Sequence, residues 1–312
     1  MSGGRQRGRA GASGGEPGGW GCQRIRVLYG RWPALADVSL DAAAGEVTAV
    51  VGADGAGKST LLRCLAGAIA PASGRVWRPA ASRIGYMPPE SGVYPDLTVT
   101  ENLVFRAGAY GIRPAETMRR AGALLERAGL AAARDRLAGR LSGGMRQKLG
   151  VIAALLHEPE LLVLDEPSTG VDPVSRAGLW WLIARAAAAG AAVVLATSYL
   201  DEAARAAAVL ALDGGRVLAS GTPEEITAAM PGTIRTAPAG LDAGPGGPGP
   251  GGGLGAGLGP RAWRRDGAWR VWQPPGLDGA PPGAAIKPDL QDAVTVAALA
   301  RELGQAAGQA AP

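Results

Sequence analysis

Cysteine and histidine are scarce in this chain of 312 residues, which contains two cysteines, Cys22 and Cys64, and one histidine, His157. Two separate cysteines, one in an apolar helical pattern and one in a loose N-terminal stretch, indicate neither a disulfide framework nor a thiolate metal site. A single histidine argues against a multi-histidine metal site. We therefore expect a protein of a reducing cytosol.

Long apolar runs and concentrated charge are lacking as well. No apolar run approaches the ~20 residues of a membrane-spanning helix, so no such helix is expected. The formal net charge of +5 is mild for this length. Nucleic-acid binders concentrate basic residues on one face, whereas here they gather near both ends of the chain, so no nucleic-acid partner is expected. These residues are Arg5, Arg7, Arg9, Arg261, Arg264, Arg265 and Arg270.

Lysine occurs only three times, as Lys58, Lys148 and Lys287, among 32 basic residues. With 50 glycines and 24 prolines, this composition is typical of a GC-rich genome that favours arginine over lysine. A lysine that remains in such a chain is a candidate functional residue, whereas a glycine match carries less weight.

Apolar patterning predicts an α/β fold with a partly parallel sheet. Continuous apolar runs at 161–165 and 192–198 have the length of strands buried on both faces of a parallel sheet. A hairpin is predicted around Asp213-Gly214-Gly215, over 210–219. The other expected strands are 24–29, 37–41, 46–51 and 82–87, and the expected helices are 59–69 and most of 99–156, with a glycine interruption at 143–144.

The ends of the chain differ in composition from its centre. Residues 1–22 predict a disordered tail, or a stretch upstream of the true start codon, because they combine arginines and glycines without an apolar segment. Residues 229–260 predict a Gly/Pro-rich linker. Residues 261–312 predict a small accessory region with a hairpin at Asp266-Gly267. Its Trp263, Trp269 and Trp272 are expected to form most of a small core rather than a base-stacking surface.

The stretch "GADGAGKST" fits the phosphate-loop pattern G-x-x-x-x-G-K-[ST], directly after the apolar run "VTAVV" and before a helical segment. Glycines let successive backbone N–H groups point inward, and the helix N-terminus adds its positive end. Lys58 is predicted to reach the β- and γ-phosphates, and Ser59 to bind Mg²⁺. The candidate nucleotide-binding residues here are Gly52, Asp54, Gly55, Ala56, Gly57, Lys58, Ser59 and Thr60.

Two carboxylates end the apolar run "LLVLDEP". Asp165 is predicted to hold Mg²⁺, directly or through water. Glu166 is predicted to orient and polarise the attacking water, the part that a general base plays in phosphoryl transfer. Acids at the end of one strand are weak evidence alone, and they gain weight from the phosphate loop.

The stretch "LSGGMRQK" at 141–148, together with these two motifs, resembles the ATP-binding subunits of ABC transporters over residues 24–228. The resemblance implies an ABC cassette over 23–228: a RecA-like P-loop NTPase core, an antiparallel β subdomain and a helical signature subdomain at about 96–156. It also implies ATP and Mg²⁺ as cofactors. In this family two head-to-tail subunits enclose two ATP molecules, and Ser142, Gly143 and Gly144 are expected to contact the partner's γ-phosphate.

Further roles are implied only by the resemblance. Tyr29 stands where the family stacks an aromatic ring on adenine, although a core aromatic is the alternative. In "STGVDP", Asp172 is expected to reach across the dimer. The stretch "ATSYLDEA" resembles a switch segment in which Ser198 replaces a histidine that senses the γ-phosphate. Pro89 stands where the family has the Q-loop glutamine, and proline has no N–H to donate. Met145 replaces a frequent glutamine.

The resemblance is closest to the export group of ABC transporters, from "LDEPSTGVDPVSR" and from "KPDLQDAVTVAAL" near the end. It implies an ATPase that powers export of a hydrophobic or drug-like molecule through separate integral-membrane permease subunits, at the cytoplasmic face of the membrane. The second ATPase subunit could be identical or different. The altered Pro89 and Ser198 positions predict slow hydrolysis. The alternatives are a soluble ABC protein of translation or repair, or a degenerate regulatory subunit that only binds ATP.

Overall fold

A six-stranded sheet forms the centre of the computed structural model, which describes residues 19–236, 261–276 and 283–309. The strand order is β5-β6-β7-β3-β8-β9, and every pair is parallel except β8 with β9. The strands are β3 Val47–Val51, β5 Ile84–Met87, β6 Leu161–Asp165, β7 Ala192–Thr197, β8 Ala208–Asp213 and β9 Arg216–Gly221. The predicted α/β fold with a partly parallel sheet is confirmed.

Side chains alternate between two cores on the two faces of this sheet. In β6, Leu161 and Val163 pack with α1 (Lys58–Ala66), whereas Leu162 and Leu164 pack with the helical subdomain. A small antiparallel sheet, β2-β1-β4, covers the α1 side. Its strands are β1 Gly19–Tyr29, β2 Trp32–Ala43 and β4 Ser73–Trp77.

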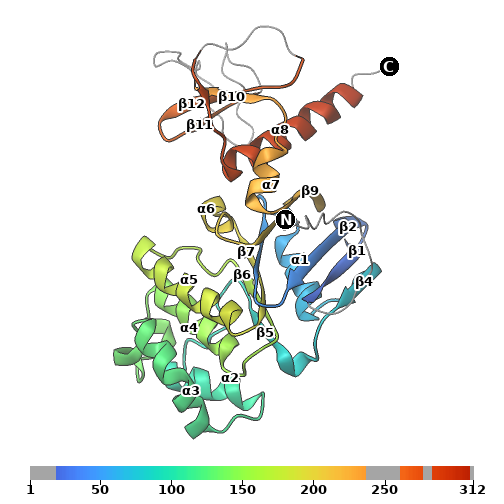
Figure 1. Cartoon of the computed structure of the whole chain (residues 1–312). Helices are drawn as coiled ribbons and strands as arrows, with labels where there is room; N and C mark the ends of the chain where they lie inside the picture. Colours follow the sequence, from blue (N-terminus) through green and yellow to red (C-terminus); the bar gives the residue numbers. More distant parts are fainter. Residues whose placement is uncertain (1–18, 237–260, 277–282, 310–312) are drawn as a thin grey trace, which may run out of the picture.

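The opposite face is covered by helices, which gather away from the β1–β2–β4 sheet in Figure 1. They are α2 Val99–Gly108, α3 Pro114–Arg127, α4 Gly143–Leu155 and α5 Pro173–Ala188, with 3₁₀ turns at Ala131–Ala133 and Ala138–Arg140. Further along lie α6 Leu200–Ala203 and α7 Pro223–Ala228. A 3₁₀ turn at Ala81–Arg83 precedes β5.

Two local expectations are corrected, and one strand was not predicted. Gly143 and Gly144 begin α4 instead of interrupting a helix, because the Ser142 side chain accepts a hydrogen bond from the Met145 N–H and caps that end. Residues 19–22 of the expected tail belong to β1, where Cys22 is buried. Strand β4 was not expected. Residues 1–18 of the tail lie outside the described residues.

The C-terminal region forms a second antiparallel sheet, in the order β11-β12-β10-β13, and a long helix, α8. Strand β10 (Thr233–Thr236) lies within the range expected to be linker, so the chain enters this sheet earlier than predicted. The rest of the linker, from residue 237, lies outside the described residues. The other elements are β11 Ala262–Arg265, β12 Ala268–Gln273, β13 Ala285–Ile286 and α8 Leu290–Gln309.

The tryptophans of this region are only partly the core that the sequence predicts. Trp272 is buried with Ile234 and Val296, and Trp263 packs at the edge of that group. Trp269 lies three residues before Trp272 in the same strand, so its side chain points to the opposite face of the sheet. The predicted hairpin is confirmed, and Asp266 and Gly267 at its turn both have positive φ.

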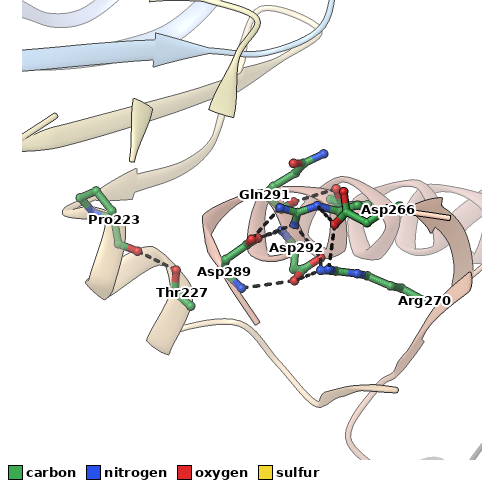
Figure 2. A network of polar contacts seen from close by, with 9 residues as sticks. Pro223, Thr227, Asp266, Arg270, Asp289, Gln291 and Asp292 are labelled. Carbon is green, nitrogen blue, oxygen red and sulfur yellow. Dashed lines mark hydrogen bonds and ion pairs between the residues drawn. The ribbon is translucent and has the colours of Figure 1, made fainter. Parts of the chain in front are cut away.

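A cluster of charged side chains joins this hairpin to the start of α8 (Figure 2). Asp292 is fully buried and pairs with both Arg265 and Arg270. Asp289 accepts two hydrogen bonds of 2.7 Å from Arg265. The Asp292 N–H also donates to Asp289 Oδ1 at 3.0 Å, so the same carboxylates cap the helix. One buried carboxylate therefore fixes the hairpin against α8.

We expect Asp292→Asn to lower the free energy of unfolding of the C-terminal region by about 2 kcal/mol, because two arginines lose a buried counter-charge. Asp266→Asn is the matched control, since Asp266 contacts the same two arginines at 3.5 and 3.6 Å but is 77% exposed. It should cost ~0.5 kcal/mol or less. Urea unfolding followed by hydrogen exchange of α8 measures both. Equal losses in the two variants would contradict a special role for Asp292.

Candidate active site

The phosphate loop leaves the carboxyl end of β3 and curls into α1. Gly52, Gly55 and Gly57 have φ values of 152°, 79° and 103°, which side chains rarely tolerate. A Cβ on Gly57 would lie 2.8 Å from the Ala34 carbonyl oxygen. Helix α1 begins at Gly57 without a side-chain cap and without an acidic residue in its first turn. Its first N–H groups are therefore available to an anion.

Lys58 extends its ammonium group into the centre of the curled loop. The Nζ atom donates to Gly52 O at 2.7 Å and to Ala53 O at 3.3 Å. It also lies 3.2 Å from Glu166 Oε1 and 3.4 Å from Ser198 Oγ. The side chain is 6% exposed, so its charge is focused toward the groups that surround it.

Asp165 lies at the carboxyl end of β6, beside the first turn of α1. Its Oδ1 accepts a hydrogen bond of 3.0 Å from Ser59 Oγ, whereas its buried Oδ2 has no hydrogen-bond partner. Burial raises the pKa of Asp165, and the nearby Glu166 carboxylate raises it further. A hydroxyl beside a buried carboxylate with a free oxygen fits a hard cation, because Mg²⁺ prefers oxygen ligands.

Glu166 is held in one orientation by hydrogen bonds from Ser198 and Thr169. Ser198 donates from its N–H to Oε2 at 3.1 Å and from its Oγ to Oε1 at 2.8 Å. Thr169 Oγ1 donates to Oε2 at 3.1 Å. The backbone of Glu166 has a φ of 51°, an unusual value for a residue with a side chain. The structure thus brings together five residues that the sequence proposed for the site: Lys58, Ser59, Asp165, Glu166 and Ser198.

The remaining loop candidates lie around this centre. Asp54 is exposed, and Thr60 is buried in the first turn of α1. Ala56 is buried, and its carbonyl oxygen accepts a hydrogen bond of 3.1 Å from the Gly215 N–H. Tyr29 ends β1 opposite Trp32, and the two residues are 50% and 68% exposed. A ring that is half exposed does not fit the alternative of a core aromatic.

The signature residues lie on the other face of the central sheet. Ser142 and Gly143 are exposed at the start of α4, and Gly144 packs near Val171. Asp172 is exposed and caps α5 by accepting a hydrogen bond from the Ser175 N–H at 2.9 Å, which lowers the pKa of its carboxyl. Because α4 and α1 cover opposite faces, a single chain does not join the signature to its own phosphate loop.

The loop that contains Pro89 is tied to α4 rather than to the phosphate loop. The Pro89 carbonyl oxygen accepts a hydrogen bond of 3.3 Å from Gln147 Nε2. Ser91 is buried with a φ of 64°, and its carbonyl oxygen would lie 2.5 Å from a Cβ on Gly150. Arg106 also donates to Tyr86 O at 2.7 Å. The loop backbone is therefore shaped by packing on the signature helix.

His157 lies just beyond the end of α4. Its ring stacks on Tyr110, with the centroids 3.7 Å apart, and burial lowers its pKa. It therefore cannot replace the histidine missing at position 198.

Two groups at the site were not recognised from the sequence. Thr169 holds Glu166, and the only sequence signal was its place three residues later in "DEPST". Glu202, 1% exposed, accepts hydrogen bonds from Ser168 Oγ at 2.6 Å and Thr197 Oγ1 at 2.9 Å. This carboxylate ties the segment after β6 to the end of β7, and so it fixes Ser198 beside Glu166.

Comparison with known proteins finds relatives in one family. The family model for the ABC transporter matches residues 35–169. The "Probable multidrug ABC transporter ATP-binding protein YbhF" of Escherichia coli is 42% identical over 210 residues, which cover 64% of this chain and 36% of that protein. The chain thus spans little more than a third of YbhF.

Other relatives are matched over more of their length. The "Nod factor export ATP-binding protein I" of Cupriavidus metallidurans is 35% identical over 215 residues, covering 65% of this chain and 71% of that protein. The "Daunorubicin/doxorubicin resistance ATP-binding protein DrrA" of Streptomyces peucetius is 39% identical over 214 residues, covering 65% of each. A solved "ATP binding subunit of ABC transporter" superimposes with a TM-score of 0.61 at 32% identity, covering 67% of this chain and 92% of that one.

Lys58→Ala is expected to weaken ATP binding about ten- to hundredfold, because a charge-assisted hydrogen bond to the phosphates is lost. Fluorescence titration with a labelled ATP analogue measures the dissociation constant. Lys148→Ala is the control, since Lys148 donates to Ala128 O at 3.1 Å from the signature helix, far from the phosphate loop in the fold. If both variants bound the nucleotide as the wild type does, the assignment of the loop would be wrong.

Proposed function

Since this chain belongs to the family of ABC transporter ATP-binding subunits, we propose that it binds ATP and hydrolyses it to power an exporter. The observation that carries the proposal is the contact between Lys58 of the phosphate loop and Glu166 at the end of β6, with Ser59 and Asp165 beside them. One edge of the sheet thus offers a cation for phosphates, oxygen ligands for a metal and a carboxylate for water.

Each residue has a distinct part in the proposed reaction. The N–H groups of the loop and of α1 bind the phosphates, and Lys58 bridges the β- and γ-phosphates. Ser59 and Asp165 would hold Mg²⁺, which offsets the charge of the phosphates when it is bound. Glu166 aligns a water molecule for attack on the γ-phosphorus. The water oxygen bonds to that phosphorus while the bond from the phosphorus to the departing ADP oxygen breaks, and the Glu166 carboxylate accepts the proton of the water.

Ser198 and Pro89 support slow rather than fast hydrolysis. Ser198 holds Glu166 through its N–H and its hydroxyl. A neutral hydroxyl forms a weaker hydrogen bond to a γ-phosphate than a charged imidazole would. Pro89 cannot donate a hydrogen bond, and its carbonyl oxygen is engaged by Gln147. These two positions also favour a second candidate function, a regulatory subunit that binds ATP without hydrolysing it.

We further infer that two cassettes complete each nucleotide site. Ser142 and Asp172 are exposed at helix starts on the face of the sheet opposite α1, which supports contact with another subunit rather than with their own phosphate loop. A head-to-tail pair would bring the signature of one subunit to the ATP held by the other. The pair can be formed by two copies of this chain or by this chain and a different cassette.

An export role rests on the relatives, which include a drug-resistance protein and a Nod factor export protein. We propose that the cargo is a hydrophobic or drug-like molecule and that integral-membrane permease subunits carry it. In the part of the chain that the structure describes, no helix has the length and apolar character to cross a membrane. The proposed place of action is the cytoplasmic face of the membrane, against those subunits.

Glu166→Gln tests hydrolysis. Phosphate release should fall about 10²- to 10⁴-fold, because the amide cannot accept the proton of the attacking water, while ATP affinity is retained. With ATP, the variant should accumulate as a dimer in size-exclusion chromatography with light scattering. Glu160→Gln, at an exposed ion pair with Arg83, is the control. A wild type that binds ATP without releasing phosphate would favour the regulatory subunit instead.

Ser198→His tests whether serine at position 198 slows ATP hydrolysis. The imidazole can reach a γ-phosphate, and the N–H of residue 198 still holds Glu166, so kcat should rise about tenfold, equivalent to ~1.4 kcal/mol of barrier. Ser198→Ala, which removes the hydroxyl alone, should lower kcat. Pro89→Gln should raise kcat less, because the proline also shapes its loop, and the double variant should exceed either single one. Steady-state kcat is measured for all four. A lower kcat in Ser198→His would mean that the site is adapted to serine.

A further inference from the structure

The turn between β8 and β9 packs against the phosphate loop. The Gly215 N–H donates to the Ala56 carbonyl oxygen at 3.1 Å, and Gly215 O accepts from the Ala36 N–H at 2.8 Å. Packing is tight around this contact: a Cβ on Gly52 would lie 2.3 Å from Leu212 O, and one on Gly215 would lie 2.6 Å from Ala34 O. The shape of the turn therefore sets the position of the loop.

Asp213 and Arg216 pair across this turn, and its two central residues, Gly214 and Gly215, have no side chains. Gly214 and Gly215 have φ values of 52° and 75°. Glycine has no side chain, so it restricts its own backbone conformation the least. Gly214 has open space around it except for the Arg301 guanidinium, 3.7 Å from the position of a Cβ. Apart from its chain neighbours, Arg301 is thus the one described residue within 4 Å of that position.

Arg301 of α8 binds this turn. Its Nη1 donates to the Asp213 carbonyl oxygen at 2.8 Å and lies 2.9 Å from Asp213 Oδ2. One guanidinium thus binds the backbone and the side chain of the same turn residue. The side chains of Arg301 and Asp213 are 24% and 44% exposed, so water screens the pair only in part.

The backbone of α8 is fixed before it reaches Arg301. Leu290 and Ala293 pack into a core with Ala49 and Val51 of β3, the strand that leads into the phosphate loop. Val296 packs into the C-terminal core with Trp272. In Figure 1, α8 runs between the C-terminal sheet and the cassette. Arg301 is therefore presented to the turn by a helix that both parts of the chain hold.

We propose that Arg301 is a positioning residue for the phosphate loop, through the Asp213–Gly215 turn, so that the C-terminal region tunes nucleotide affinity in the same chain. The inference rests on the proposed binding of ATP and adds a regulator to it. The path has a hydrogen bond at each end. Arg301 binds Asp213, the backbone runs from Asp213 to Gly215, and Gly215 donates to Ala56 of the phosphate loop. A movement of α8 is transmitted to the backbone that contacts the phosphates.

The test uses the full chain and a fluorescent ATP analogue. Arg301→Ala should raise the dissociation constants of the ATP and ADP analogues about three- to fivefold, the size expected for a partly exposed charge pair. KM for ATP should rise in parallel while kcat stays within about twofold, because Glu166 and Ser198 are not on this path. Arg301→Lys should recover part of the affinity, since an ammonium group keeps the charge pair.

Two further variants separate positioning from stability. Asp213→Asn should weaken affinity less than Arg301→Ala does, because the Asp213 carbonyl oxygen still binds Arg301. It also changes the turn without changing α8, so it carries the test if Arg301→Ala disturbs the helix. Arg264→Ala is the control: Arg264 is an exposed arginine of the same region that contacts no charged partner within the described residues. It should leave affinity unchanged.

Each outcome bears on a different claim. A wild type that binds neither analogue would contradict the proposed function, and this inference with it. A wild type that binds both, with affinities unchanged in Arg301→Ala and Asp213→Asn, would overturn the positioning role and leave ATP binding intact. Affinity losses in Arg301→Ala matched by an equal loss in Arg264→Ala would likewise overturn it, because a general charge effect would then explain both.

Discussion

The contact between Lys58 and Glu166 depends on five parallel strands that end at the same edge of one sheet. Burial on both faces leaves these strands no freedom to slide, since every residue of β6 and β7 is buried. The chain leaves β3 to form the phosphate loop, leaves β6 at Asp165 and leaves β7 at Ser198. Charged groups that are distant in sequence therefore meet where the apolar core ends, and the core carries the cost of holding them close together.

Two buried carboxylates act as fixed points in the fold. Glu202 binds the segment after β6 to the end of β7, and Asp292 binds the C-terminal hairpin to α8. In each case the carboxylate accepts several hydrogen bonds or pairs with arginine, which offsets the desolvation of its charge. The first fixes Ser198 beside Glu166. The second fixes the helix that carries Arg301 to the β8–β9 turn.

The two departures from the family pattern have different structural settings. Ser198 keeps the backbone bond to Glu166 that any residue there would make, so the loss is confined to the reach and charge of its side chain. Pro89 lies in a loop that is packed on α4 through Gln147 and Gly150. Changing that residue alone leaves the loop backbone as the signature helix shapes it. Substitution at Ser198 is therefore expected to change hydrolysis more directly than substitution at Pro89.

Local patterns of glycines, charges or apolar residues were enough to predict the phosphate loop, the acidic end of β6, the β8–β9 and β11–β12 hairpins and the class of the fold. Pairing between distant segments was decided by tertiary structure. Ser198 meets Glu166 across 32 residues, Arg301 meets Asp213 across 88, and β10 joins strands that follow the residues predicted to be a linker. A single hydrogen bond between distant segments leaves no periodic trace in the sequence, since its geometry exists only after the surrounding core has packed.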